Sequence, residues 1–174
     1  MQLYIHATWN GYRFFKGQDE EPFLKGRRIT KPFGRWASRI LSVDGKEIVT
    51  IDVTHSPWFW SKENVRYGIH FLESQVEFEV EGINFWRRHF QFTFNGDQYD
   101  FYGHIGQRKS LYRKGVQVAK YDRGYDYDFV VANNDEDPLL LLSLFMMIEV
   151  GHESDFGSVV DGVIDYDSTW YPTK

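Results

Sequence analysis

No cysteine occurs among the 174 residues of the chain. This absence excludes disulfide bonds, thiolate metal sites and cysteine nucleophiles. No Asn-x-Ser/Thr sequon is present, and no apolar run approaches the roughly 18 residues that a membrane-spanning helix requires. Residues 1–10 also lack the charged start and the long apolar stretch of a signal peptide. These absences predict a cytoplasmic protein without a transmembrane segment.

The composition favours strands over helices. Aromatic residues make up 18% of the chain, and aromatic side chains are enriched in strands, where each buries a large area. The length fits one domain spanning residues 1–174, and no Pro/Gly/Ser-rich linker divides it. We therefore expect a single domain that is mainly β.

Charge is distributed unevenly along the chain, whose formal net charge is −5. Residues 1–121 hold 18 basic and 13 acidic residues, a net of +5, whereas residues 122–174 hold 2 basic and 12 acidic residues, a net of −10. Such asymmetry marks either a polar interaction surface or a fold whose two faces differ in sign.

Alternating apolar and polar residues predict at least six strands joined by short turns. The pattern is clearest in residues 46–53, 76–81, 89–94 and 125–131. Asp44-Gly45 and Asn95-Gly96 have the composition of two-residue turns with positive φ at both positions, and residues 113–115 predict a longer hairpin loop. Short antiparallel hairpins in this number indicate a barrel or a sandwich.

Residues 138–150 break this pattern and read PLLLLSLFMMIEV. Asp137 is a favourable N-cap and Pro138 suits the first helical turn, so we expect a helix roughly 20 Å long. Only Ser143 and Glu149 are polar, and they share no stripe along the helix. A helix that is apolar all round has to be surrounded by protein, and the strands are the available cover. The alternative is a helix packed on one open sheet.

Three consecutive pieces of the chain resemble a known family. They are residues 110–121 (SLYRKGVQVAKY), the strand at residues 125–131, and residues 135–142 (DEDPLLLL). Together they resemble the tubby C-terminal-like superfamily, which includes the LURP-one-related proteins and the phospholipid scramblases. Its members end with a glycine-centred hairpin carrying Val-Ala-Lys, a strand, an acidic Asp-Pro cap and a hydrophobic helix.

The resemblance covers roughly residues 107–150. It implies a closed antiparallel β-barrel of about twelve strands that encloses one C-terminal hydrophobic helix. It also implies an anionic phospholipid as ligand, because tubby domains bind phosphoinositides through basic residues. The acidic tail, residues 153–174, departs from the family pattern.

A basic window without any acidic residue spans residues 22–43. Its cations are Lys25, Arg27, Arg28, Lys31, Arg35 and Arg39. Cationic side chains bind phosphate through charge and forked hydrogen bonds, so this window is the predicted site for an anionic ligand. The alternative is an ordinary solvated surface.

Three adjacent aromatic residues, Trp58, Phe59 and Trp60, follow Pro57. Tryptophan is favoured at the membrane–water interface, so this segment is a predicted membrane or partner contact. The alternative is a hydrophobic plug that covers one end of the barrel.

Residues that carry catalytic or metal chemistry show no characteristic spacing. The six histidines lack metal-ligand spacing, and no Gly-x-Ser-x-Gly sequence occurs. We therefore expect a protein that is not an enzyme and has neither a cofactor nor a bound metal.

Three functional hypotheses remain. The first is a non-enzymatic binding domain for an anionic phospholipid or another phosphorylated ligand, cytoplasmic and peripheral at the membrane. The second is a protein–protein interaction or regulatory module, such as a bacterial toxin-neutralising protein, that presents the acidic region 153–174 to a basic partner. The third is a small hydrolase that uses a His/Asp site, which would require a pocket near His104 or His152. No nucleic-acid partner is expected, and the sequence leaves the oligomeric state open.

Overall fold

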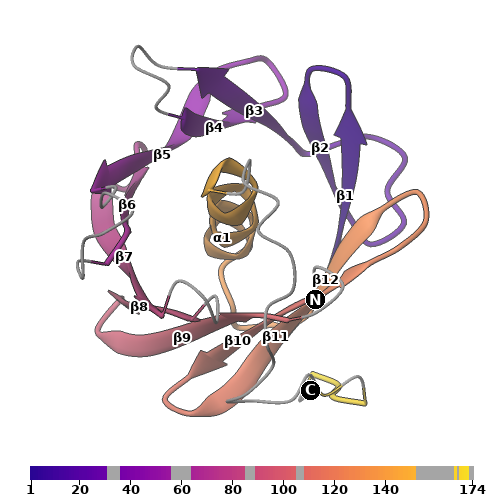
Figure 1. Ribbon diagram of the computed structural model, residues 1–174. Helices are drawn as coiled ribbons and strands as arrows, with labels where there is room; N and C mark the ends of the chain where they lie inside the picture. Colours follow the sequence, from indigo (N-terminus) through magenta and orange to yellow (C-terminus); the bar gives the residue numbers. More distant parts are fainter. Residues whose placement is uncertain are drawn as a thin grey trace.

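The strands of the chain close into a barrel around one helix (Figure 1). The computed structural model describes residues 1–30, 36–55, 64–84, 89–104, 108–151, 167 and 169–172. Its strands are β1 (Gln2–Thr8), β2 (Gly11–Lys16), β3 (Leu24–Thr30), β4 (Trp36–Ser42), β5 (Glu47–His55), β6 (Arg66–Phe71), β7 (Val76–Asn84), β8 (His89–Phe94), β9 (Asp97–Gly103), β10 (Lys109–Arg113), β11 (Val116–Arg123) and β12 (Asp128–Ala132). The helix is α1 (Pro138–Gly151).

Each strand pairs antiparallel with its neighbours in the sequence, and β1 pairs with β12 to close the ring. Leu3 lies opposite Val130 in this closing pair. The strand direction alternates around the barrel. At one end of the barrel β1 and β3 end, and at this same end β2 and β12 begin. The helix starts at the opposite end and runs toward this one, which we call the helix-exit end.

The helix fills the interior of the barrel. Residues 140–148 are all buried, and they form one cluster with the inward residues of the strands. An eight-stranded barrel can be filled by side chains alone, whereas twelve strands enclose a wider space that the helix occupies. The predicted closed barrel around an enclosed helix is therefore confirmed, and the alternative of an open sheet is wrong.

The polar groups of the helix find partners inside the barrel. Ser143 Oγ donates a hydrogen bond to the carbonyl of Leu139 at 2.6 Å, and Tyr121 Oη donates one to the carbonyl of Leu141 at 3.0 Å. Bonds of this kind remove the cost of burying polar atoms. The hydrophobic sequence therefore carries its few polar atoms into the core without leaving them unpaired.

Two hairpins have a two-residue turn with positive φ at both positions. Asn95-Gly96 has φ values of 50° and 82°, as predicted, and Lys114-Gly115 has 52° and 79°. The longer loop that we predicted at residues 113–115 is therefore wrong, because Arg113 still pairs with Val116.

The predicted turn type at Asp44-Gly45 is also wrong. Only Gly45 has a positive φ, of 93°, and its N–H donates to the carbonyl of Ser42 at 3.0 Å. This is a type I turn followed by a left-handed glycine. The physical reason is the hydroxyl of Ser42. It donates to the Asp44 carboxylate and accepts from the N–H of Lys46 at 3.1 Å. These two bonds stabilise a turn that is longer than two residues.

Candidate anion-binding groove

A groove of about 980 Å³ opens between the β1–β2 hairpin and β3. Among the described residues it is lined by residues 7–13, residues 25–28 and Leu41. It exists because β2 and β3 pair through only three residues of each strand, with Phe14 opposite Leu24 at one limit and Tyr12 opposite Gly26 at the other. Beyond Gly26 the two strands diverge toward the helix-exit end.

Cations occupy the outer wall of this groove. Leu24 and Gly26 face the core, so Lys25 and Arg27 point outward from β3. Arg13 lies directly opposite Lys25 in the β2–β3 register. Side chains in such pairs have Cβ atoms about 5 Å apart. Lys25 Nζ donates to the carbonyl of Val43 at 2.8 Å, so it has to leave this bond to share a bound anion with Arg13. No acidic residue is among the described residues that line the groove.

Two arginines of the predicted window are paired with carboxylates. Arg28 contacts the Glu149 carboxylate of α1 at 3.1 Å, and the hydroxyl of Tyr12 donates to the same carboxylate at 3.0 Å. Arg39 lies 3.4 Å from Asp52 and 3.8 Å from Glu47, and its side chain is only 12% exposed. Both arginines are therefore neutralised by partners of their own.

The Tyr12 hydroxyl is held in its protonated form by this arrangement. Burial raises its pKa, and the Glu149 carboxylate raises it further, while Arg28 acts in the opposite direction. The protonated hydroxyl remains a hydrogen-bond donor to Glu149. It thereby connects the groove to the last turn of the helix.

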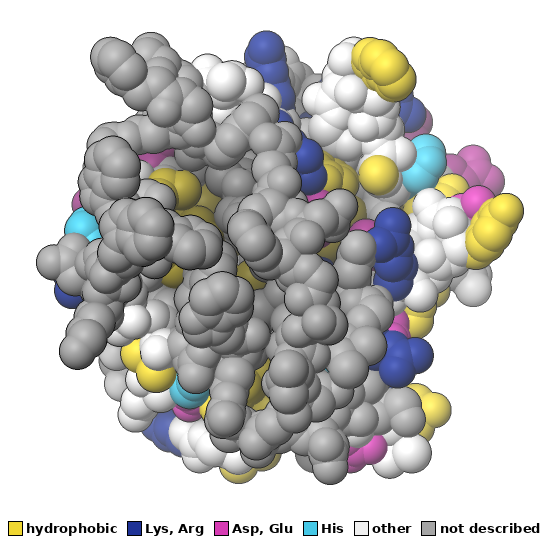
Figure 2. All heavy atoms as spheres, viewed as in Figure 1, with side chains coloured by type: hydrophobic (Ala, Val, Ile, Leu, Met, Phe, Trp, Pro, Cys, Tyr) yellow, Lys and Arg dark blue, Asp and Glu magenta, His cyan; other side chains and the backbone are white. Residues whose placement is uncertain are grey.

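Trp9 stands at the tip of the β1–β2 hairpin with its side chain fully exposed, at 100%. Figure 2 shows hydrophobic side chains projecting over this hairpin, with Lys and Arg side chains beside them. The hairpin is held against β3 at Gly11, where a Cβ would come within 2.1 Å of the carbonyl oxygen of Gly26. Glycine at this position therefore allows the hairpin to approach β3 closely.

Several predicted site residues lie outside the described residues. They are Lys31, Arg35, Trp58, Phe59 and Trp60. Of the six cations in the window, Lys25 and Arg27 line the outer wall of the groove, and Arg28 faces inward. The acidic region 153–174 is described only at residues 167 and 169–172.

Two groove residues, Arg13 and Trp9, lie outside the acid-free window. The alternation of Tyr12, Arg13 and Phe14 indicates that Arg13 faces outward, but only the register of β2 against β3 places it opposite Lys25. Nothing local to Trp9 distinguishes an exposed tryptophan from a core one.

A buried serine–histidine pair bears on the hydrolase hypothesis. His104 Nε2 lies 2.7 Å from Ser110 Oγ, and both side chains are buried. Neither the groove nor a small cavity of about 10 Å³ beside Lys109 is lined by this pair. No group of three potential metal ligands occurs among the residues that the structure describes. His152 lies outside them.

The described part of the chain contains no helix long and apolar enough to cross a membrane. No protein-family model matches the chain, and neither a curated protein nor a solved structure matches it. The groove and the fold are therefore the features that bear on its function.

Proposed function

We propose that this chain is a non-enzymatic binding domain of tubby-like fold that holds an anionic, phosphorylated ligand in the groove. The observation that carries the proposal is the outer wall, to which β2 contributes Arg13 and β3 contributes Lys25 and Arg27, and whose described lining includes no carboxylate. Arginine is suited to phosphate because its planar guanidinium donates two parallel hydrogen bonds.

The register of the strands supports this reading. Arg13 pairs with Lys25, and the neighbouring pair on the same outer face is Arg27 with Arg39. Like charges directly opposite each other destabilise a sheet. Arg39 is compensated by Asp52 and Glu47, but no carboxylate of the described residues lies within ion-pair distance of Arg13 or Arg27. A bound anion would supply the missing negative charge.

Trp9 favours an anionic phospholipid as the source of the phosphate. An exposed indole at a hairpin tip can insert at the membrane–water interface while neighbouring cations contact the headgroups. A closed barrel around a hydrophobic helix is also the plan of the tubby-like fold, which supports the assignment. In this proposal the protein is cytoplasmic and binds the membrane surface peripherally.

Vesicle sedimentation tests the proposal. Phosphatidylcholine vesicles with and without a phosphoinositide are incubated with the protein at about 0.1 M and about 1 M salt. We expect sedimentation only with the phosphoinositide, and less of it at high salt. Arg13→Gln/Arg27→Gln should lose most of the binding. The matched control Lys46→Gln/Lys114→Gln removes the same charge from the opposite end of the barrel and should bind as the wild type does.

A competition arm identifies the source of the phosphate. If soluble inositol hexakisphosphate releases the protein from the vesicles, the groove recognises the phosphorylated headgroup itself. Trp9→Ala should then weaken vesicle binding but leave binding of the soluble inositol phosphate unchanged. Equal loss of sedimentation in the two charge variants would reject the groove as the site, since binding would then follow net charge alone.

A further inference from the structure

Two polar residues on the outer face of β10 and β11 are buried. Ser110 and Lys120 lie opposite each other and point away from the core, yet they are only 1% and 6% exposed. On β7 the outward residues Glu77 and Glu79 are exposed, as is usual where outward and inward residues alternate in a barrel. Some other part of the molecule therefore covers this face.

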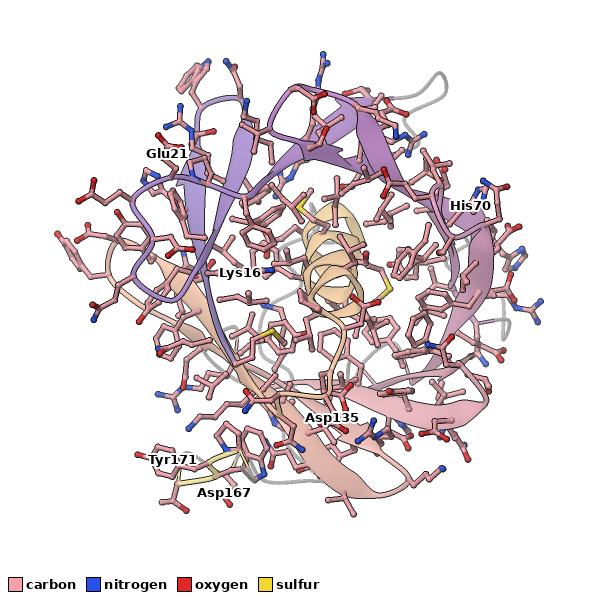
Figure 3. All side chains as sticks on the ribbon, turned by 180° about the vertical axis from the view of Figure 1, so that it is seen from behind. Lys16, Glu21, His70, Asp135, Asp167 and Tyr171 are labelled. Atoms are coloured by element: carbon pink, nitrogen blue, oxygen red, sulfur yellow. The ribbon has the colours of Figure 1, made fainter. Side chains whose placement is uncertain are left out.

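A segment near the end of the chain lies on this face. We call Asp167 together with residues 169–172 the strap. The ring of Tyr171 is 5.0 Å from Lys120 Nζ, in a cation–π contact. The negative charge of Asp167 contributes to a raised pKa of Tyr112 on β10, although burial is the larger cause. Figure 3 shows Asp167 and Tyr171 together outside the wall of the barrel.

The strap has a defined local shape. The Asp167 carboxylate accepts from the N–H of Thr169 at 2.8 Å and from its hydroxyl at 2.7 Å. The Tyr171 ring lies over Lys120, and the charge of Lys120 adds to the lowering of the Asp167 pKa that the hydrogen bonds from Thr169 cause. The part of the strap that contacts the barrel is therefore an acidic turn followed by a tyrosine.

The strap is held by side chains. Among the described residues, no backbone hydrogen bond joins it to the barrel, and Tyr171 remains 75% exposed. Because the Tyr171 ring is largely exposed, its cation–π contact with Lys120 is weak. A tethered segment nevertheless competes at an effective concentration on the order of millimolar. The strap therefore occupies this face within the same chain. Because its contacts are weak, a second peptide with the same acidic and aromatic groups can replace it.

We propose that the outer face of β10 and β11, centred on Lys120 and Tyr112, is a docking site for a peptide segment that carries an acidic turn followed by a tyrosine. The strap occupies this site and competes with the partner. The partner contributes a carboxylate toward Lys120 and an aromatic ring over its ammonium group. This site is separate from the groove and does not depend on the function proposed for it.

Peptide binding to full-length variants tests the inference. The probe is a fluorescently labelled peptide with the sequence of residues 164–172, IDYDSTWYP, and fluorescence anisotropy measures its binding. Asp167→Ala/Tyr171→Ala removes the carboxylate and the aromatic ring of the strap and leaves the docking face unsubstituted. We expect this variant to bind the peptide about tenfold more tightly than the wild-type chain, because the internal competitor is lost.

Substitutions on the docking face complete the test. Adding Lys120→Met to the strap variant should abolish peptide binding, whereas Lys120→Arg, which retains the cation, should preserve it. Lys114→Met, at an exposed lysine in the adjoining turn, is the matched control and should bind normally. Circular dichroism verifies that each variant is folded. Equal peptide binding by the wild type and the strap variant, or no binding by either, would overturn the proposal, as would normal binding by folded Lys120→Met.

Discussion

Charged residues at both ends of the helix are bonded to the barrel. At the helix-exit end, Glu149 accepts from Arg28 and Tyr12. At the other end, Glu136 precedes the helix and is buried, with Arg113 Nη1 3.2 Å from its Oε1. No hydrogen bond forms to this Oε1 among the described residues, while Tyr99 Oη donates to the other carboxylate oxygen at 3.3 Å. Burial therefore raises the pKa of Glu136 in spite of Arg113.

This raised pKa predicts how stability depends on pH. The folded state binds the proton of Glu136 more tightly than the unfolded chain, in which a glutamate has a pKa of about 4.3. The stabilisation is present below the unfolded pKa and is lost as pH rises through the folded pKa. Glu136→Gln cannot ionise, so we expect its free energy of unfolding to increase relative to the wild type between about pH 4 and about pH 7.

Urea unfolding at the two pH values measures this difference. Glu77→Gln, at an exposed position on β7, is the control and should show no comparable change. If the free energy of unfolding of Glu136→Gln instead fell relative to the wild type as pH rose, Arg113 would outweigh burial and the direction of the pKa shift would be wrong.

The cations show how far single residues could be predicted. The acid-free window was visible in the sequence, and it does supply Lys25 and Arg27 to the groove. Of its other described members, Arg28 is bound to a carboxylate on α1 and Arg39 to two carboxylates on β5. Those partners are distant in the sequence or depend on strand register, so a linear window could not show which cations are paired with a carboxylate.

At the scale of elements, the helix start was predictable because its signals are local. Asp137 caps the helix through its carboxylate, which accepts from the N–H of Leu139 at 2.7 Å. Turn types were less predictable. Asn95-Gly96 has the predicted turn, whereas the hydroxyl of Ser42 changes the turn at Asp44-Gly45, and the dipeptide alone does not reveal that contact.

Removing the cap should weaken the helix start. Asp137→Ala leaves the N–H of Leu139 without its acceptor, so we expect a loss of about 1 kcal/mol in the free energy of unfolding. Asp137→Ser restores an acceptor and should recover most of that loss. Chemical denaturation of the three proteins measures the effect. Equal destabilisation by alanine and serine would show that the cap contributes through its charge and not through this hydrogen bond.

Gly26 sets the distance between β3 and the helix. A Cβ at this position would lie 2.8 Å from Phe14 Cζ and 2.9 Å from Met146 Sδ. Gly26→Ala therefore overpacks the core, and we expect a loss of about 1–3 kcal/mol in the free energy of unfolding. The loss should shrink in a Met146→Ala background, because the two sites share the same space.

Gly68→Ala is the matched control for this substitution. Its Cβ would lie 2.9 Å from Thr54 Cγ2, and Thr54 is exposed and can move aside. Gly68→Ala should therefore cost less than Gly26→Ala when both are measured by denaturant unfolding. Equal costs would indicate that the helix can shift away from β3 and that the interior is not tightly packed there.

At the scale of the molecule, the enclosure of the helix was predictable, but the closing strand pair and the number of strands were not. A helix without a polar stripe indicates full enclosure whatever surrounds it. The closure itself depends on β1 pairing with β12, where Ile5 lies opposite Asp128. No local pattern specifies a pairing between residues so far apart, and the number of strands came from the family resemblance rather than from periodicity.

If the helix is the core of the barrel, one substitution in it should destabilise every strand. Leu144 is fully buried, and Leu144→Ala should cost about 2–5 kcal/mol out of a total stability of about 5–15 kcal/mol. Alanine is the better helix former, so a helix that stood outside the wall would not be weakened by this change. Val116→Ala, at an exposed strand position, is the control and should change stability by less than about 0.5 kcal/mol.

Thermal unfolding followed by two probes distinguishes the cases. Far-UV circular dichroism reports helix and sheet together, and near-UV circular dichroism reports the packing of the aromatic side chains that line the wall, such as Phe101 and Tyr121. Both midpoints should fall together in Leu144→Ala, because Tyr121 bonds to the helix and loses its support when the helix is displaced. A near-UV transition that kept its wild-type midpoint would mean that the wall stands without the helix, and the packing argument for enclosure would fail.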